Sequence, residues 1–334
     1  MIFDAHWHLI CPQAAQRCAA IDPVKAGDYA CGVNEQTARI NQKRSVVWSR
    51  KMSNPDEQLQ DMEKAGIDIA MLQPPPIGYY YWTEPQLGSG LSRMVNENTA
   101  GFIAKYPERF YGWATVPLQD PIMAAAEVRF AVEELKLSGI TLTSNVNGHG
   151  LDEERFDPFW EAVQDLDVPL FIHPGNPPGA ERLANYYLTN FLGFPVETTL
   201  AAVSMVFGGV FDRFPRLKLC LAHAGGVLPF LLGRFEHGQA QRPEAREKCR
   251  HPFSHYLKNI YVDTVTFSVP TLRYVISMLP PGHVFFGTDY PFDMADMEGV
   301  ALVKEAVGDD SALSEEIFYG VMAKLVGLPP RVGV

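Results

Sequence analysis

Short apolar segments recur along this 334-residue chain, and stretches with the pattern of amphipathic helices separate them. The segments IDIAMLQPP and VPLFIHPG show no polar alternation, as buried strands do, whereas residues 54–66 and 120–139 have apolar side chains spaced i, i+3, i+4. Buried strands that alternate with helices are typical of a parallel sheet covered on both faces. Eight such segments occur, at residues 1–8, 67–75, 110–117, 138–145, 168–175, 217–226, 259–266 and 283–291.

The number of segments distinguishes between two parallel-sheet architectures. Eight strand–helix units in a chain of this length predict an α/β fold of the (β/α)₈ TIM-like barrel type. A doubly wound open sheet is the alternative, but no glycine-rich phosphate loop follows the first strand. We expect one domain over residues 1–334, because no linker, low-complexity tract or repeat interrupts the pattern. Residues 11–53 have weak periodicity and follow the first strand, so we predict an inserted lid over the active face.

The composition excludes several classes of partner. Hydrophobic residues make up 47% of the chain, which predicts a large core. A net charge of −11 argues against nucleic acid and against an acidic membrane surface, although a few arginines could still bind a small anionic substrate. No apolar run has the length of a membrane span, and no signal peptide is recognisable. The five scattered cysteines contain no CxxC pair, which favours a reducing cytoplasm; they are Cys11, Cys18, Cys31, Cys220 and Cys249.

Ligand-type side chains stand at the ends of the predicted strands. His6 and His8 are two apart on the first strand and therefore point to the same side. His173, His223 and Asp289 end the fifth, sixth and eighth strands. Active sites of such barrels lie at the carboxyl ends of the strands, and imidazole and carboxylate are good ligands for zinc and similar ions. A single histidine at a strand end is usually a core residue, but five such side chains on one face indicate a metal site.

These motifs resemble those of a known family. HxH on the first strand, HPG after the fifth, HAGG after the sixth and GTDYPF on the eighth resemble the amidohydrolase superfamily, in its branch of aminocarboxymuconate semialdehyde decarboxylase and related metal-dependent decarboxylases. The resemblance covers nearly the whole chain. It implies non-oxidative decarboxylation of an unsaturated or aromatic carboxylic acid by a metal-dependent carboxy-lyase. A hydrolase or hydratase of a related ring-cleavage metabolite is the alternative, and an inactive binding barrel is a third reading.

The resemblance also assigns roles to individual residues. It implies one divalent ion, zinc or alternatively manganese, whose ligands are His6, His8, His173 and Asp289. His223 takes the place of the acid/base residue, and Asp289 shares the catalytic role. It further implies a homodimer in which Arg234 reaches the substrate carboxylate in the partner subunit. The fourth strand lacks the lysine that bridges two ions in other members of the superfamily, which favours a single ion.

The expected substrate pocket departs from the family pattern. Ser45 stands where a second carboxylate-binding arginine is expected, and either of its neighbours, Arg44 or Arg50, could replace it. Asn190 takes the place of a pocket tryptophan, and Phe292 of the GTDYPF motif is expected to line the pocket. His149 follows the fourth strand and could reach the pocket or remain at the surface. Asp4 is predicted to hydrogen-bond near the metal ligands.

Overall fold

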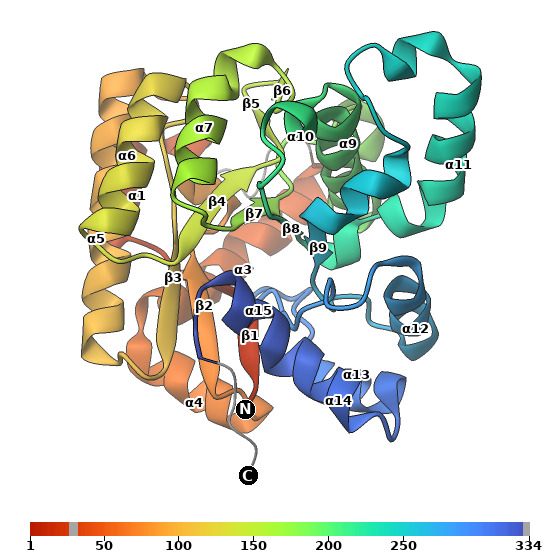
Figure 1. The fold of residues 1–334 in the computed structure, drawn as a ribbon. Coiled ribbons are helices and arrows are strands. Elements are labelled where there is room, and N and C mark those ends of the chain that lie inside the picture. Colours follow the sequence, from red (N-terminus) through yellow and green to blue (C-terminus); the bar gives the residue numbers. More distant parts are fainter. Residues whose placement is uncertain (27–32, 330–334) are drawn as a thin grey trace.

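The computed structural model describes residues 1–26 and 33–329, and Cys31 of the predicted lid lies outside them. In the described chain the main sheet is parallel, and its strand order β1-β2-β3-β4-β7-β8-β9 follows the order along the chain (Figure 1). In a doubly wound sheet the order of the strands along the chain reverses partway across the sheet, so the observed order excludes that alternative. The strands are β1 (Phe3–His8), β2 (Ile69–Gln73), β3 (Phe110–Ala114), β4 (Gly139–Thr143), β7 (Leu170–His173), β8 (Leu219–Leu221) and β9 (Ile260–Val262), with a separate antiparallel pair β5 (Asn145–Val146) and β6 (His149–Gly150).

The eighth predicted segment differs from the expectation because it does not form a regular strand. Val284 makes an isolated parallel bridge to Val262 of β9, and Tyr290 makes one to Trp7 of β1. The segment therefore lies between the first and last strands of the sheet. Asp289 has φ of 65°, which interrupts an extended conformation. The observed architecture is a mixed α/β fold with a curled parallel sheet.

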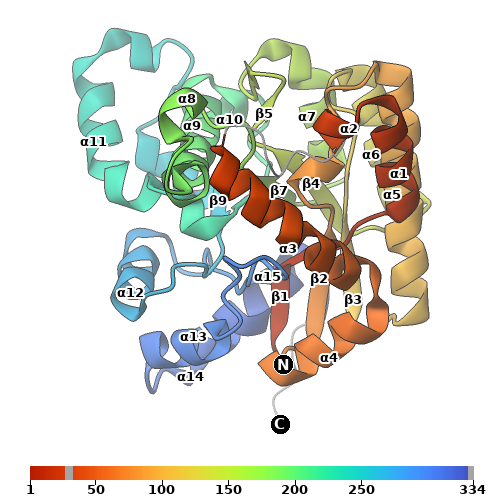
Figure 2. The same cartoon turned by 180° about the vertical axis from the view of Figure 1, so that it is seen from behind.

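The helices pack around this sheet (Figures 1 and 2). Both helices predicted most clearly are confirmed: α4 and α6 begin with capping side chains, Asn54 and Asp120, each followed by proline at the first helical position. The helices are α1 (Pro12–Ile21), α2 (Pro23–Ala26), α3 (Glu35–Ser53), α4 (Pro55–Ala65), α5 (Pro85–Lys105), α6 (Pro121–Glu133), α7 (Asp157–Asp165), α8 (Ala180–Leu183), α9 (Phe194–Phe207), α10 (Val210–Arg213), α11 (Leu228–Gln241), α12 (Val269–Met278), α13 (Gly299–Val307), α14 (Ser311–Glu315) and α15 (Val321–Leu325).

The predicted lid region contains helices that the sequence pattern did not reveal. α3 crosses in front of the sheet in Figure 2. Its buried residues Thr37, Asn41, Trp48 and Met52 lie on one helical face, but two of the four are polar. The polar pair removes the apolar periodicity that would have predicted a helix. At its far end, Trp48 and Met52 pack with Ile10, which holds α3 against the end of β1.

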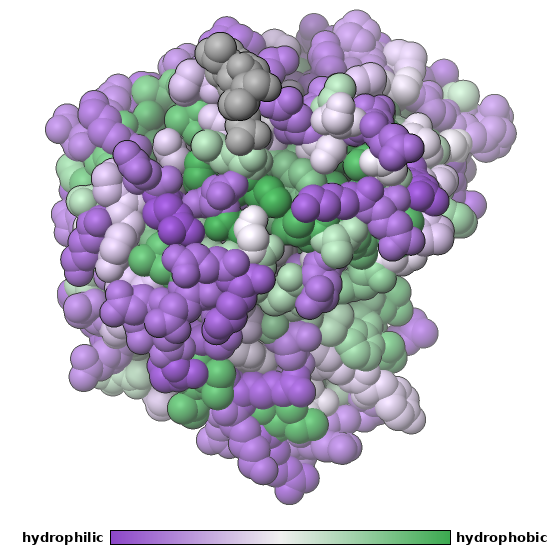
Figure 3. Space-filling view, turned by 90° about the horizontal axis from the view of Figure 1, so that it is seen from below, coloured by the Kyte–Doolittle hydropathy of each residue, from purple (hydrophilic) through white to green (hydrophobic). Residues whose placement is uncertain are grey.

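The strands enclose a packed apolar floor beneath their carboxyl ends. Phe3, Met71, Phe171 and Phe285 form one buried cluster that continues into side chains of α15. His6 lies directly on this floor, with its ring centroid 4.9 Å from that of Phe171. Figure 3 views the molecule from the end where β1 begins, and polar side chains cover much of that face around a central apolar area. The floor keeps water from reaching the histidines from this end.

One helical stretch, Thr189–Phe207, is long and apolar enough to cross a membrane by length and composition. It comprises a π-helical turn (Thr189–Gly193) followed by α9. Ala202 and Met205 are fully buried in the main core, so this stretch packs as a core helix of the fold.

Candidate metal centre

Four ligand-type side chains converge at the carboxyl end of the sheet. The ligand atoms of His6, His8, His173 and Asp289 all lie within 4.8 Å of one another, and all four residues are buried. The Nε2 atoms of His6, His8 and His173 are 3.1, 3.0 and 3.7 Å from Asp289 Oδ1. β1, β7 and the segment after Phe285 thus deliver the four side chains to one point, as the sequence predicts.

The proton positions on the three rings suit metal binding. Nδ1 of His6 lies 2.8 Å from Asp263 Oδ2, Nδ1 of His8 is 3.2 Å from the carbonyl oxygen of Pro74, and Nδ1 of His173 is 3.0 Å from that of Pro174. Carbonyl and carboxylate oxygens accept hydrogen bonds, so each Nδ1 donates its proton. Each Nε2 is then the atom with a free lone pair, as in histidine ligands generally.

The spacing of these atoms fits one ion. Zinc bonds of about 2.0–2.1 Å in a tetrahedral arrangement place neighbouring ligand atoms about 3.4 Å apart. The nitrogen–oxygen separations of 3.0–3.7 Å bracket that value. Within the described chain, the buried Nε2 atoms of His6 and His173 face Asp289 Oδ1 but make no hydrogen bond of good geometry. Buried polar atoms without partners are costly, and a cation between them would satisfy both.

The electrostatics also favour a bound cation. Burial alone would raise the pKa of Asp289, but the facing histidines, His6 above all, hold it well below its usual range. Burial would lower the pKa of His6, yet Asp289 and Asp263 raise it to about 10. Burial lowers the pKa of His173 to about 3. Burial would likewise raise the pKa of Asp263, but His6 lowers it, so two ionised carboxylates lie in this buried site and hold an extra proton on His6 between them. A bound cation would supply the same positive charge and would release that proton, which frees the Nε2 lone pair.

His223 approaches the other oxygen of Asp289. Its Nε2 lies 3.3 Å from Asp289 Oδ2, and its side chain is 17% exposed while those of the four ligands are nearly inaccessible. His223 and Asp289 have φ of 55° and 65°, a left-handed conformation that is strained in residues other than glycine. The turn at His223, after β8, directs the imidazole toward Asp289. The turn at Asp289, in the segment that bridges to β1, directs the carboxylate toward His223.

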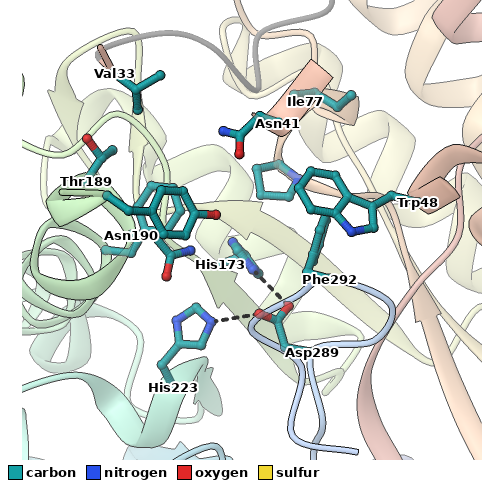
Figure 4. A pocket seen from close by; sticks show the side chains of 13 residues that line it. Val33, Asn41, Trp48, Ile77, His173, Thr189, Asn190, His223, Asp289 and Phe292 are labelled. Atoms are coloured by element: carbon teal, nitrogen blue, oxygen red, sulfur yellow. Dashed lines mark hydrogen bonds and ion pairs between the residues drawn. The ribbon is translucent and has the colours of Figure 1, made fainter. Parts of the chain in front are cut away.

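A cavity of about 120 Å³ opens above the four-residue cluster. Figure 4 shows His173 and His223 approaching Asp289 from two sides, with Asn41 and Trp48 of α3 at the outer wall. An apolar cavity of about 150 Å³ can hold benzene, so this space matches one small ring. The lining residues are Val33, Asn41, Trp48, Pro76, Ile77, His173, Tyr187, Thr189, Asn190, Phe194, His223, Asp289 and Phe292.

The structure separates the predicted substrate residues into two groups. Asn190 and Phe292 line the cavity. Arg44 forms an ion pair with Asp293, the residue after Phe292. Burial and the charge of Asp289 raise the pKa of Tyr187, and the positive charge of Arg44 lowers it. Arg50 instead pairs with Glu57.

Three further predicted residues lie away from the cavity lining. Arg234 belongs to α11. His149 is half exposed and pairs with Glu153 at the surface. Asp4 is fully buried and accepts from the backbone nitrogen of His6 and from the hydroxyl of Thr288, so it supports the backbone of β1 and does not contact an imidazole.

Sequence reasoning missed Asp263, Tyr187 and the two lining residues of α3, Asn41 and Trp48. Asp263 follows β9 directly, at the same carboxyl-end position that identified the histidines. A search for polar side chains at the carboxyl ends of all predicted strands would therefore have identified Asp263. Tyr187 comes from the loop between β7 and α9, where no periodic pattern marks a lining residue.

Comparison with known proteins identifies the family. The amidohydrolase family pattern matches residues 3–324. A 2-amino-3-carboxymuconate-6-semialdehyde decarboxylase from Dictyostelium discoideum is 34% identical over 280 residues, which are 83% of this chain and 78% of that protein.

Two solved structures share the fold. The crystal structure of 5-carboxyvanillate decarboxylase from Sphingomonas paucimobilis has a TM-score of 0.87 and 26% identity, over 98% of this chain and 99% of that one. A dihydroxybenzoic acid decarboxylase from Polaromonas sp., solved with manganese and the inhibitor 2-nitroresorcinol, has a TM-score of 0.83 and 24% identity, over 99% and 98%. With its own His/Asp metal-binding cluster, the chain belongs to the amidohydrolase family, in the branch of metal-dependent decarboxylases.

Proposed function

We propose that this enzyme decarboxylates a small unsaturated or aromatic carboxylic acid without oxidation. The observation that carries the proposal is the arrangement of His223, a partly accessible imidazole directed at the free oxygen of a ligand carboxylate, at the base of a ring-sized cavity. Such a group can transfer a proton to a substrate atom held above the metal cluster.

The chain supplies a binding site, a proton donor and an enclosed cavity. His6, His8, His173 and Asp289 would hold one divalent ion, zinc by their ligand set, with manganese as the alternative. The ion supplies Lewis-acid polarisation of a substrate oxygen. His223 gives its proton to the carbon that bears the carboxylate. The proton takes the electron pair of a double bond of the substrate. The bond from this carbon to the carboxyl group then breaks, its electron pair restores that double bond, and CO₂ leaves.

The cavity wall favours a planar substrate. Trp48, Tyr187, Phe194 and Phe292 contribute aromatic rings to it. Flat rings bury well against such walls. Asn190, in the place of a larger residue of the family, leaves room and a polar amide for a ring substituent. Both arginines form ion pairs, Arg44 with Asp293 and Arg50 with Glu57. Arg44 is the one whose charge acts on Tyr187 of the cavity wall, so it supplies the positive charge for the carboxylate.

We propose that the enzyme acts as a homodimer whose partner lends Arg234. Several large apolar side chains remain exposed on neighbouring elements: Phe191 and Leu192 of the π-helical turn, Val196 and Leu200 of α9, Phe230 of α11 and Phe267 before α12. An exposed apolar surface of this kind is typical of a protein interface. A second cavity, lined by Phe191 and Phe267, reaches His223 and Asp289 from this side and provides a route for a guanidinium.

We further propose that the chain forms a full (β/α)₈ barrel in one domain and that residues 11–53 act as its lid. The bridges from Val284 and Tyr290 to the two outer strands support a closed barrel. Asn41 and Trp48 in the cavity wall support a lid role for α3. The family match over residues 3–324 supports one catalytic domain. We further propose a cytoplasmic location, since the described cysteines are all free and buried.

The test is an assay of the metal-loaded enzyme with a panel of ortho-hydroxylated benzoic acids and unsaturated diacids in D₂O. We expect release of CO₂ and one deuterium at the carbon that carried the carboxylate. The His223→Ala variant, loaded with the same metal, is the control and should release CO₂ far more slowly. Incorporation of ¹⁸O from labelled water into the product without CO₂ would instead establish a hydrolase or hydratase.

A further inference from the structure

Asp263 accepts hydrogen bonds at both of its oxygens. It follows β9, is fully buried, and has Oδ2 at 2.8 Å from His6 Nδ1 and 3.0 Å from the backbone nitrogen of His223. Its Oδ1 accepts from the backbone nitrogens of Ala224 at 2.7 Å and Val265 at 3.1 Å. Four donors thus surround one carboxylate. With four N–H groups directed at it, Asp263 is not arranged as a fifth metal ligand.

Two of these contacts stabilise a strained turn. His223 and Ala224 have φ of 55° and 54°, and Gly225 and Gly226 continue with φ of 73° and 67°. Left-handed residues other than glycine are strained, and they persist only where surrounding contacts compensate. Successive backbone N–H groups that point at one anion provide such compensation. Asp263 therefore helps to hold the backbone from which the His223 imidazole projects.

The third contact fixes a metal ligand. A carboxylate at Nδ1 selects the tautomer of His6 and sets the direction of Nε2 toward Asp289. The neighbouring segment makes room for this pair, because a Cβ at Gly287 would lie 2.8 Å from the Cβ of His6 and 3.1 Å from that of Asp263. The glycine lets the eighth segment pass between the two side chains.

We propose that Asp263 is a positioning residue that aligns the ligand His6 and the proton donor His223 together, through one carboxylate. The two groups come from β1 and β8, which are not neighbours in the sheet. Asp263 connects them by a path of two hydrogen bonds. The His223 part of this inference rests on the function proposed above, and the His6 part does not.

The test is Asp263→Asn, which keeps the size of the side chain but places an amide NH₂ against N–H donors. Affinity for zinc and for manganese, measured by competition with a chromogenic chelator, should fall about 10–100-fold. Turnover at full metal occupancy should also fall. In a His223→Ala background, the substitution should weaken metal binding by the same factor. At full metal occupancy it should lower the residual turnover by a smaller factor than in the parent, because the part that acts through His223 is already absent.

A matched control is Asp4→Asn. Asp4 is also a buried carboxylate, but its hydrogen bonds in the described structure come from the backbone nitrogens of His6 and Thr288 and from the hydroxyl of Thr288. An amide at this position can still accept the two backbone hydrogen bonds through its oxygen, while its NH₂ faces the Thr288 hydroxyl, which can accept. Metal affinity of this variant should remain within about threefold of the parent, a small fraction of the loss expected at Asp263.

Several outcomes overturn the proposal. Unchanged metal affinity in Asp263→Asn removes the His6 part, and unchanged turnover at full occupancy removes the His223 part. A loss of turnover in the His223→Ala background as large as that in the parent shows that the effect does not pass through His223. Asp263→Ser serves if the first variant does not fold, and failure of both to fold by circular dichroism marks Asp263 as structural only. If the parent enzyme releases no CO₂, the proposed function fails while the metal-affinity measurement still decides the His6 part.

Discussion

The metal cluster and the outer rim of the cavity are built in different ways. In the cluster, each histidine projects from a buried strand end, and a fixed acceptor orients its ring. At the rim, Arg44 and Arg50 project from α3 and form ion pairs while roughly half exposed. The buried backbone fixes the positions of the cluster histidines, whereas the two arginines can exchange ion-pair partners at little cost in free energy. We therefore propose that the chemistry depends on the rigid cluster and that the rim arginines contribute to the choice of substrate.

Removal of a ligand should have the largest effect and tests the rigid side of this comparison. His173→Ala should lower the metal content well below the parent's value of about one ion per chain, because it removes one of the four predicted ligands from the cluster. CO₂ release should disappear with the metal. Elemental analysis of purified protein measures the stoichiometry, and His149→Ala, a surface histidine, is the matched control. Two ions per chain in the parent enzyme would contradict a single site.

The second prediction separates the proton donor from the ligands. His223→Ala should retain about one ion per chain but lose about 10²–10⁴-fold in kcat, the contribution of general acid catalysis. Metal analysis and steady-state kinetics on the same preparation test this. Loss of the metal in this variant would place His223 among the ligands and enlarge the rigid cluster.

A smaller effect is expected for the arginine of the proposed partner subunit. Arg234→Ala should lower kcat/KM about 10–100-fold, because a charge-assisted hydrogen bond contributes about 1.5–3 kcal/mol. Mixing this variant with His223→Ala and allowing subunits to exchange should restore part of the activity, since one site of each heterodimer is then intact. No recovery despite exchange, verified by mass spectrometry of tagged subunits, argues against a role in trans.

The smallest effects should appear at the rim. Arg44→Ala should raise KM about tenfold through loss of one carboxylate contact, while Arg50→Ala, a matched arginine on the same helix, should change KM less than about twofold. Steady-state kinetics on both variants decide between the two arginines. Equal increases in KM for the two variants would contradict the assignment of the carboxylate contact to Arg44.

The same contrast explains what could be predicted from the sequence. Strand ends and histidine spacing follow from short-range pattern, so His6, His8, His173, His223 and Asp289 could be placed together in advance. The polar face of α3, with Thr37 and Asn41 buried, carries no periodic signal, and its helix was not predicted. The left-handed turn at Asp289 explains why the last segment is not a regular strand. Such features depend on tertiary contacts, which pattern alone does not encode.

The position of Asp289 has a consequence for how the enzyme is made. Two of its ligand partners, His6 and His8, lie on the first strand, more than 280 residues earlier in the chain, and the backbone nitrogen of Asp289 donates to the carbonyl oxygen of His6. The chain must therefore be synthesised at least through Asp289 before the site can assemble. Until then, β1 presents two imidazoles without their carboxylate partner. Once assembled, the ion acts as a cross-link that closes a very long loop, and its contribution to stability grows with the chain entropy that it removes.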